Sequence, residues 1–363
     1  LTPLIGQKIG EIFAKAGAPN GLVQIVHGAG ETGAALVDAA PDKLMFTGSV
    51  ATGKKIAAAA AKNLTSTVLE LGGKDPMIVF EDANLELAAS GAVWGAFCNA
   101  GQSCSSVERL YVHESVADKL TALIVERTNS LKQGRGDSED ISIGPMSSER
   151  QLRIVEDHVA AFREAGAKIE IGGNADIPVR HSEDADKNVR VPLFFPPTVI
   201  TGATNDMRPM REETFGPTLP IATFKSEAEA IRLANDSEFG LTASVWTRDH
   251  AKGKRVAEQI EAGSVCINEV LYTHGIGQTP WGGFKNSGQG RTHGIEGLME
   301  LVQPQHIHTN RIAVLPNAWW MPYTPIAVET FRGFATKFAS GSLLKTAALM
   351  PQLLKRVREL LKK

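Results

Sequence analysis

Three short apolar runs, each followed by a glycine turn, constrain the fold of this chain most strongly. They occupy residues 22–27 (LVQIVH), 43–47 (KLMFT) and 67–71 (TVLEL). Segments of helical character alternate with them at residues 4–16, 31–39 and 52–61. Strand–helix alternation at this spacing predicts βαβ units and a parallel sheet.

The same alternation continues beyond residue 71 and places the whole chain in the α/β class. We expect strands at residues 76–80, 110–112 and 242–247. We expect helices at residues 85–99, 116–131, 150–164, 227–235 and 250–262. A length of 363 residues is enough for two domains or one large one.

The composition excludes several classes of protein. The formal net charge of −2 provides no global field for nucleic acid. The three cysteines, Cys98, Cys104 and Cys266, form no regular disulfide framework, and no Cys/His group has zinc spacing, so we expect no metal. No apolar run is long enough to span a bilayer. A reduced, cytoplasmic location is expected.

Cys104 lies among glycine and small polar residues in the segment 99–106 (NAGQSCSS). A thiol at such a turn is suited to nucleophilic attack, because backbone N–H groups lower its pKa and can face a developing oxyanion. The alternative is a buried, inert cysteine. Cys98 and Cys266 lie in apolar runs and are interpreted as buried.

Glu70 lies inside the apolar run of residues 68–71 (VLEL). Burial of a carboxylate raises its pKa, which suits a general base that works near neutral pH. A glutamate at the end of a strand that points to water is the alternative.

Two further segments are suited to binding a dinucleotide. Residues 46–53 (FTGSVATG) leave a strand and enter a helix, whose N-terminal N–H groups can bind phosphate. Residues 212–217 (EETFGP) offer carboxylates for a ribose diol and a phenyl ring for a nicotinamide. Taken alone, the first segment is a weak signal, because any strand–turn–helix can contain two glycines, and the second is better explained as an ordinary polar loop with one anchoring Phe.

Taken together, these segments resemble the aldehyde dehydrogenase superfamily, continuously over residues 1–308. The resemblance rests on residues 69–74 (LELGGK), 101–104 (GQSC), 46–53, 213–217 (ETFGP) and 280–288 (PWGGFKNSG). It implies an aldehyde dehydrogenase-like fold that has a partial Rossmann-type cofactor domain and an α/β catalytic domain. The implied boundaries are residues 1–71 for the NAD(P)-binding part, 72–283 for the catalytic domain, 284–310 for a return segment with an oligomerisation strand, and 311–363 for a connector and a basic tail.

The resemblance also implies a role for individual residues. Cys104 attacks a small-molecule aldehyde, hydride passes to NAD or NADP, and Glu70 activates the water that hydrolyses the resulting thioester. The implied cofactor-binding residues are Gly48, Ser49, Gly53, Leu71, Glu213 and Phe215. Trp281 lines the substrate tunnel. The chain is thus expected to be an NAD(P)-dependent aldehyde dehydrogenase that forms a carboxylic acid.

Two other functions stay open. In a CoA-acylating relative, CoA takes the thioester in place of water, although Glu70 favours water. The third hypothesis is a catalytically impaired homologue. The chain begins at Leu1 without an initiator Met, so we expect a piece of a longer protein. The family's oxyanion-binding asparagine and adenosine-ribose lysine are expected upstream of Leu1, and this fragment is expected to be unstable or inactive.

The C-terminal segment has an apolar, basic character. Leu343, Ala347, Met350, Leu354, Val357 and Leu361 form an apolar stripe at helical spacing, and Lys345, Lys355, Arg356, Arg358 and Lys362 lie off it. Such a helix binds a membrane surface or docks on the body or on a neighbouring subunit. Pro351 interrupts the stripe. Family behaviour implies a homo-oligomer, a dimer or a tetramer, joined through residues 301–308.

Overall fold

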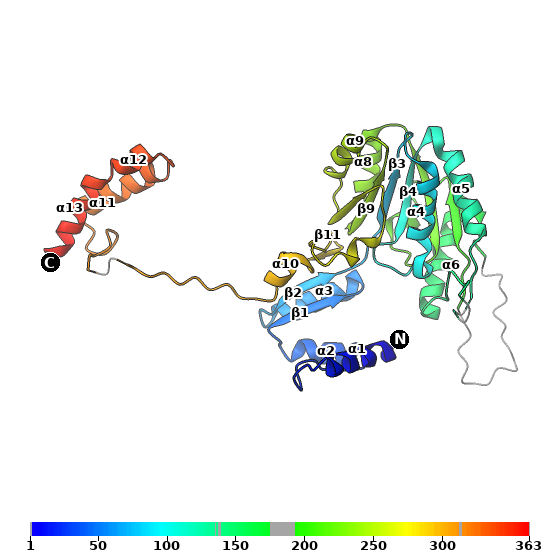
Figure 1. Cartoon of the computed structure of the whole chain (residues 1–363), viewed down its shortest axis with the longest axis horizontal. Helices are drawn as coiled ribbons and strands as arrows, with labels where there is room; N and C mark the ends of the chain where they lie inside the picture. Colours follow the sequence, from blue (N-terminus) through cyan, green and yellow to red (C-terminus); the bar gives the residue numbers. More distant parts are fainter. Residues whose placement is uncertain (1, 135, 137–138, 175–192, 312–313, 363) are drawn as a thin grey trace. The chain divides into compact units, whose positions relative to one another are not determined.

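The computed structural model describes residues 2–134, 136, 139–174, 193–311 and 314–362 (Figure 1). The chain forms two compact units, Leu1–Val302 and Gln303–Lys363. We describe each unit by itself.

A small sheet in the first unit contains the first predicted βαβ unit. Strand β1 (Lys43–Thr47) pairs in parallel with β2 (Ser66–Glu70), and helix α3 (Val50–Ala61) connects them. The short strand β12 (Gly288–Gln289) pairs with the other edge of β2 in antiparallel orientation. The two predicted strands at residues 43–47 and 67–71 are therefore confirmed.

The predicted strand at residues 22–27 is wrong. This segment lies between α1 (Pro3–Lys15) and α2 (Gly30–Asp38) without regular structure, and Leu22 and Val26 are more than half exposed. An apolar run becomes a strand where a neighbouring strand takes up its backbone hydrogen bonds. Residues 22–27 pair with no strand of the described chain.

A larger sheet forms the centre of the first unit. Within the described residues its strand order is β10-β9-β3-β4-β7-β6-β5, parallel except for the β5–β6 pair. The strands are β3 (Asp75–Val79), β4 (Val107–His113), β5 (Lys168–Ile171), β6 (Thr198–Thr201), β7 (Thr218–Phe224), β9 (Thr242–Trp246) and β10 (Ser264–Ile267). The predicted α/β class is confirmed.

Helices cover both faces of this sheet (Figure 1). Alternate residues of each strand point to opposite faces, so Met77 and Val79 pack in one core while Ile78 packs in the other. The first core includes residues of α4 (Leu85–Phe97), α5 (Ala117–Asn129) and α6 (Glu149–Glu164). The second includes residues of α8 (Glu227–Asn235) and α9 (His250–Ala257).

Strand β4 is longer than the sequence indicated. The predicted strand covered residues 110–112, whereas β4 begins at Val107 and includes the buried charged residues Glu108 and Arg109. A buried strand is predicted from an unbroken apolar run, and the two charged residues interrupt that run. Their burial indicates that they bond within the protein.

Short elements complete the first unit. They are η1 (Cys98–Gly101), η2 (Glu114–Val116), α7 (Arg208–Arg211), β8 (Phe239–Gly240), η3 (Tyr272–Gly275), β11 (Phe284–Lys285) and α10 (Gly294–Met299). Strands β8 and β11 pair in antiparallel orientation. Residues 301–308, the predicted oligomerisation segment, form no strand within the described chain.

The second unit is helical. It contains α11 (Pro325–Gly333), the π-helical turn η4 (Phe334–Phe338), α12 (Leu343–Ala347) and α13 (Met350–Leu361). Pro351 lies in the first turn of α13, where proline is tolerated, so the predicted stripe is divided between two helices. Among the described residues, no helix combines the length and the apolar character that crossing a bilayer requires.

Candidate active site

A pocket of about 640 Å³ brings seven of the nine predicted site residues together. It lies where the carboxyl ends of β1 and β2 meet the loops that precede β4 and β7. In parallel α/β sheets, ligands bind outside the carboxyl ends of strands. The predicted residues in its wall are Gly48, Ser49, Glu70, Leu71, Cys104, Glu213 and Phe215.

Cys104 lies in a turn between η1 and β4. The backbone before it is strained, because Asn99 and Ala100 have φ angles of 54° and 56°, in the left-handed region. The side chain of Asn99 donates to the Gln102 carbonyl (3.0 Å), and Gln102 accepts from Ser147 N (2.8 Å). These bonds hold the turn, and the cysteine it carries, at the pocket wall.

The Cys104 thiol is protonated at neutral pH in the protein alone. Burial, followed by the carboxyl groups of Asp75, Glu213 and Glu70, raises the pKa of this thiol to about 11. A backbone hydrogen bond lowers it, as the sequence predicted, but this is the smallest contribution. The predicted net direction was therefore wrong, because desolvation outweighs the backbone dipoles. Attack by sulfur requires a base or a positive charge nearby.

Glu70 has the properties of such a base. It is the last residue of β2 and is half-buried in the pocket wall. Burial raises its pKa to about 7, against the opposing effects of Trp281, Arg291 and Thr292. One oxygen, Oε1, is buried and has no hydrogen-bond partner among the residues that the structure describes. The predicted rise in pKa is confirmed, and a carboxylate with this pKa can accept a proton from a reactant near neutral pH.

The turn between β1 and α3 supplies Gly48 and Ser49. The Ser49 side chain caps α3 by accepting from Thr52 N (3.4 Å), and the two residues directly before this helix, Gly48 and Ser49, line the pocket. Gly53 lies one turn later and does not line the pocket. A Cβ at Gly53 would approach the Leu71 side chain to 2.6 Å, so this glycine allows α3 to pack closely on the end of β2.

The loop with Glu213 and Phe215 is fixed by a buried ion pair. The Glu108 carboxylate accepts from Thr214 N (2.7 Å) and from Phe215 N (2.8 Å). It also pairs with Lys74 Nζ at 2.6 Å. Phe215 has a φ of 51°, a strained conformation that these bonds maintain. Sequence reasoning missed Glu108 because it lies within a strand and only the fold brings it to this loop.

Glu213 itself is held against residues 72–73, which follow Glu70 in the segment 69–74 (LELGGK). Its Oε1 accepts from Gly73 N at 3.0 Å. Burial and the negative charge of Glu108 raise the pKa of Glu213 to about 7. A Cβ at Gly72 would lie 2.4 Å from the Glu213 carboxylate, so only glycine permits this approach.

The N-terminus of α6 forms a further part of the wall, which the sequence analysis missed. This part comprises Ser147, Ser148, Arg150, Gln151 and Ile154. Ser148 accepts from Gln151 N (3.2 Å), a capping arrangement that the Ser-x-x-Gln spacing could have revealed. That spacing locates the start of a helix, but it does not show what the helix faces.

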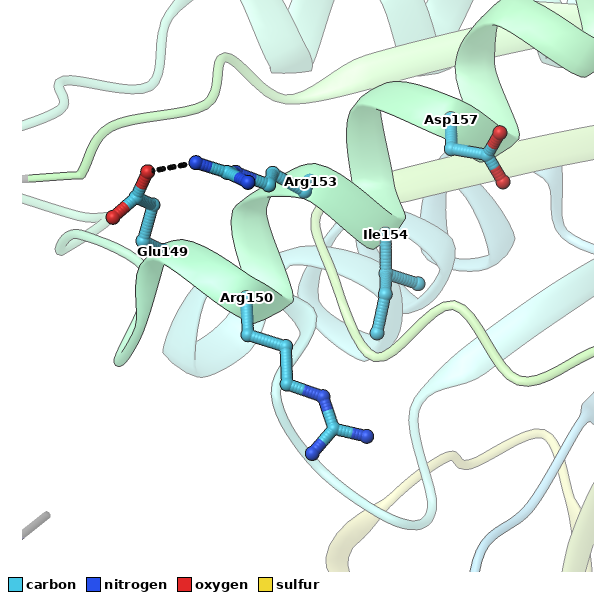
Figure 2. A pocket seen from close by; sticks show the side chains of 5 residues that line it. All are labelled: Glu149, Arg150, Arg153, Ile154 and Asp157. Carbon is cyan, nitrogen blue, oxygen red and sulfur yellow. Dashed lines mark hydrogen bonds and ion pairs between the residues drawn. The ribbon is translucent and has the colours of Figure 1, made fainter.

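An open pocket of about 550 Å³ continues along α6 from the main pocket. It is lined by Glu149, Arg150, Arg153, Ile154 and Asp157. Figure 2 shows Arg150 and Ile154 pointing to one side of the helix, whereas Arg153 pairs with Glu149. Arg150 thus brings a positive charge to the edge of the main pocket.

Trp281 lies behind Glu70 and not in the pocket wall. It is buried, hydrogen-bonds to the Glu70 side chain, and exchanges backbone bonds with Thr292. The His274 ring contacts it edge-on at 5.0 Å. The role of Trp281 as a tunnel residue stays a prediction. The contacts observed for it position the base.

Comparison with known proteins identifies a sequence family. The model of the aldehyde dehydrogenase family matches residues 1–307 of the chain. A 4,4'-diapolycopene aldehyde oxidase from Methylomonas sp is 42% identical over 98% of this chain and 64% of its own length. A betaine aldehyde dehydrogenase from Bacillus subtilis (strain 168) is 40% identical over 85% of this chain and 62% of its own length.

A solved structure has the same fold. Betaine aldehyde dehydrogenase from Staphylococcus aureus, crystallised in complex with NAD+, superposes with a TM-score of 0.73 at 38% identity. The match covers 81% of this chain and 56% of that chain. The chain thus spans less than two thirds of the length of each of these three relatives.

Proposed function

The chain belongs to the aldehyde dehydrogenase family, and we propose that its pocket oxidises an aldehyde to a carboxylic acid with NAD or NADP. The observation that carries this proposal is that Cys104 and Glu70 share one pocket, where the pKa of Glu70 is about 7. A nucleophile with a nearby base of near-neutral pKa is the arrangement that acyl chemistry through a thioester needs.

The proposed reaction uses Cys104 twice. Its sulfur forms a bond to the aldehyde carbon as the thiol proton passes to the Glu70 carboxylate, and the carbonyl oxygen becomes an alkoxide. Glu70 releases this proton to solvent before the second half of the reaction. When bound, the oxidised nicotinamide supplies the acceptor for the hydride that leaves this carbon, together with a positive charge that favours the thiolate. A thioester remains on Cys104. Glu70 then takes a proton from water, which attacks the thioester, releasing the carboxylate and the thiol.

The pocket offers groups suited to the pyrophosphate and the nicotinamide half of a dinucleotide. Gly48 and Ser49 lie at the N-terminus of the twelve-residue helix α3, which favours a pyrophosphate. Glu213 supplies a carboxylate for a ribose diol, and Phe215 supplies a ring that can support the nicotinamide. Leu71 adds an apolar surface, and Gly53 sets the position of α3.

We propose a long apolar aldehyde as the substrate class. The Methylomonas relative is named for an aldehyde of diapolycopene, which is a long hydrocarbon chain. Its match covers 98% of this chain and so includes most of the Gln303–Lys363 unit, whereas the match to the Bacillus enzyme covers 85%. We also propose a cytoplasmic homo-oligomer, a dimer or a tetramer, with a peripheral membrane contact through this unit.

A CoA-acylating reaction is the second candidate. It needs no base for water, so the perturbed carboxyl of Glu70 favours hydrolysis. Formation of an acyl-CoA in place of the free acid would decide for the alternative.

Two measurements on the full chain test the proposal. The first is the alkylation rate of Cys104 by iodoacetamide, located by peptide mass spectrometry, with and without NAD+ and a long-chain aldehyde. We expect Cys104 to react faster with NAD+ present, and the aldehyde to protect it. The second is the formation of reduced nicotinamide, which we expect to disappear in a Cys104→Ala variant.

Cys266 provides the internal control, because burial also raises the pKa of its thiol to about 11 but it lies outside the pocket. Equal alkylation of Cys104 and Cys266 under all conditions would overturn the proposal and favour a non-catalytic homologue. Since the labelling follows a single step, it is informative independently of complete turnover.

A further inference from the structure

The Gln303–Lys363 unit buries few of its large apolar side chains. Among its described residues, the buried apolar side chains are Ala318, Ala327 and Leu349. At least half exposed are Ile307, Val314, Trp319, Trp320, Met321, Tyr323, Phe338, Leu343, Leu344, Met350, Leu354 and Leu361. A soluble surface rarely concentrates so many apolar side chains, so this unit presents a binding surface.

Residues 318–323 (AWWMPY), here called the Arg356 loop, are held in place by one buried guanidinium. Arg356 is fully buried, and its Nε donates to the Ala318 carbonyl at 3.0 Å. Its Nη2 donates to the carbonyls of Trp320 and Pro322. Its Nη1 pairs with Glu359 at 2.6 Å. The guanidinium thus fixes the backbone of the loop from inside.

The side chains of the Arg356 loop point outward as a result. Trp319, Trp320, Met321 and Tyr323 are 58%, 51%, 74% and 62% exposed. A loop fixed by its backbone loses little entropy when its side chains bind a surface. Tryptophan and tyrosine are enriched where proteins meet the boundary between lipid and water, because their rings are apolar with one polar atom.

Helix α13 presents two adjacent stripes to the outside. At 3.6 residues per turn, Met350, Leu354, Val357 and Leu361 fall on one line along the helix. A line of exposed basic residues, Lys355, Arg358 and Lys362, runs beside it. Arg356 was expected among these basic residues, but it points inward to the Arg356 loop. An exposed apolar stripe flanked by cations is the pattern of a helix that lies at a membrane surface.

Charge separates the two units. Residues 303–363 contain nine Lys and Arg against two Asp and Glu, which gives +7. The whole chain is −2, so residues 1–302 carry −9. A local cluster of this kind attracts anionic lipid. The cores of protein interfaces are depleted in lysine, so lysines next to the apolar stripe favour a lipid partner over a protein partner.

We propose that the Gln303–Lys363 unit binds the surface of anionic lipid bilayers, through the Arg356 loop and the exposed face of α13. The rings and aliphatic side chains enter the boundary region, while Lys355, Arg358 and Lys362 contact lipid phosphates. The consequence for the substrate rests on the proposed function: an enzyme at this surface meets apolar aldehydes dissolved in lipid.

The test is co-sedimentation of the full chain with vesicles. One set is phosphatidylcholine alone, and in the other about a third of the lipid is phosphatidylglycerol. We expect binding to the anionic vesicles, and weakening by added salt. A Lys355→Glu, Arg358→Glu, Lys362→Glu variant should lose about a hundredfold in affinity, because each cation contributes to attraction at the surface.

A Trp319→Ala, Trp320→Ala variant should bind the same vesicles about tenfold more weakly. The matched control reverses three exposed lysines of the first unit, Lys119, Lys225 and Lys254, and should bind like the unchanged chain. Equal binding by all three variants would overturn the proposal.

The alternative partners give different results in the same experiment. If the unit covers the first unit or a second copy of the chain, the unchanged chain will not sediment with vesicles. Light scattering without lipid would then show an altered mass for the tryptophan variant if a second copy is the partner. Either result overturns the lipid proposal. Cys104 labelling in the same variants reports on the proposed function separately, because these changes lie outside the pocket.

Discussion

The loop with Glu213 and Phe215 and the Arg356 loop are both held by a buried charged side chain that bonds to their backbone. Glu108 accepts from two N–H groups of the first loop, and Arg356 donates to three carbonyls of the second. The first loop turns its side chains into a pocket. The second turns them outward. A buried charge that bonds to loop backbone therefore shapes a concave site in one unit and an outward-facing surface in the other.

This difference also appears in where the apolar residues lie. The first unit has two large apolar cores on the faces of a sheet, although Leu4, Leu22 and Leu64 are among its exposed apolar residues, and the buried Lys74 and Glu108 pair with each other. The second unit leaves its apolar side chains outside. We infer that the first unit is built to exclude water from a reaction and the second to displace water from a partner surface.

The largest expected effect in the pocket comes from Glu70→Gln. The amide cannot take a proton from water, so hydrolysis of the thioester should slow by about a hundredfold or more. In the unchanged chain this step should accelerate about tenfold per pH unit below pH 7 and level off above it, because the basic form of a group with a pKa of about 7 becomes complete there. In the variant the dependence on pH should vanish.

Steady-state rates and acyl-enzyme trapping from pH 5 to pH 9 measure this. Glu126→Gln, a change of the same kind at an exposed position of α5, is the control. A pH profile unchanged by Glu70→Gln would exclude Glu70 as the base. Glu70 would then have only a structural role, as the buried Arg356 has in the second unit.

The next largest effect is expected from Arg356→Met. This change removes a buried guanidinium and leaves three carbonyls and Glu359 without it, so it should destabilise the second unit by about 3 kcal/mol. Hydrogen exchange of α11 and α13 and limited proteolysis report on it. Arg358→Met, on the exposed side of the same helix, should change the stability by less than about 0.5 kcal/mol.

The reactivity of Cys104 should be the same in both arginine variants, since the two units are separate compact bodies. Equal protease resistance of Arg356→Met and Arg358→Met would show that the loop needs no buried guanidinium, and the parallel between the two loops would fail.

The sequence predicted those features of the two regions that are determined by residues close together in the chain. It failed where contacts between distant residues decide. Cys104, Glu70 and the Gly48–Ser49 turn belong to local motifs, and their assembly in one pocket agrees with the prediction. The strands at residues 43–47 and 67–71 were predicted because apolar runs and glycine turns mark them locally. The pKa of Cys104 was wrong in direction, because burial is decided by residues distant in sequence.

The features that the sequence concealed are the buried charges. Glu108 interrupts an apolar pattern, and the loop residue it bonds to, Thr214, is more than a hundred residues away in the sequence. Arg356 was grouped with the exposed cations of α13, because periodicity alone does not show which polar side of a helix packs inward. In both cases the charge bonds to backbone groups, and backbone groups leave no trace in the residue pattern.

Glu108→Gln tests the pocket side of the comparison and should have a moderate effect. The amide cannot accept at both oxygens and loses the charge that faces Lys74, so the strained Phe215 should relax. We expect the KM for the cofactor to rise about tenfold. The pKa of Glu213 should fall, since Glu108 raises it. Glu86→Gln, in an exposed pair with Arg127, should change neither. An equal rise in the KM for the cofactor in Glu108→Gln and Glu86→Gln would show that Glu108 does not position the loop.

The smallest expected effect comes from Arg150→Gln at the edge of the pocket. The guanidinium is exposed and lies on the side of α6 that it shares with Ile154 (Figure 2). Its attraction for the phosphates of a cofactor is weakened by water and salt, so the KM should rise about threefold at low ionic strength and by less at high salt. Arg153→Gln, on the same helix but paired with Glu149, is the matched control. If the effect of Arg150→Gln persists at high salt, this arginine binds the cofactor directly, as Glu108 and Arg356 bind their loops. An exposed charge would then act as the buried ones do, and the distinction between buried and exposed charges would not hold at this position.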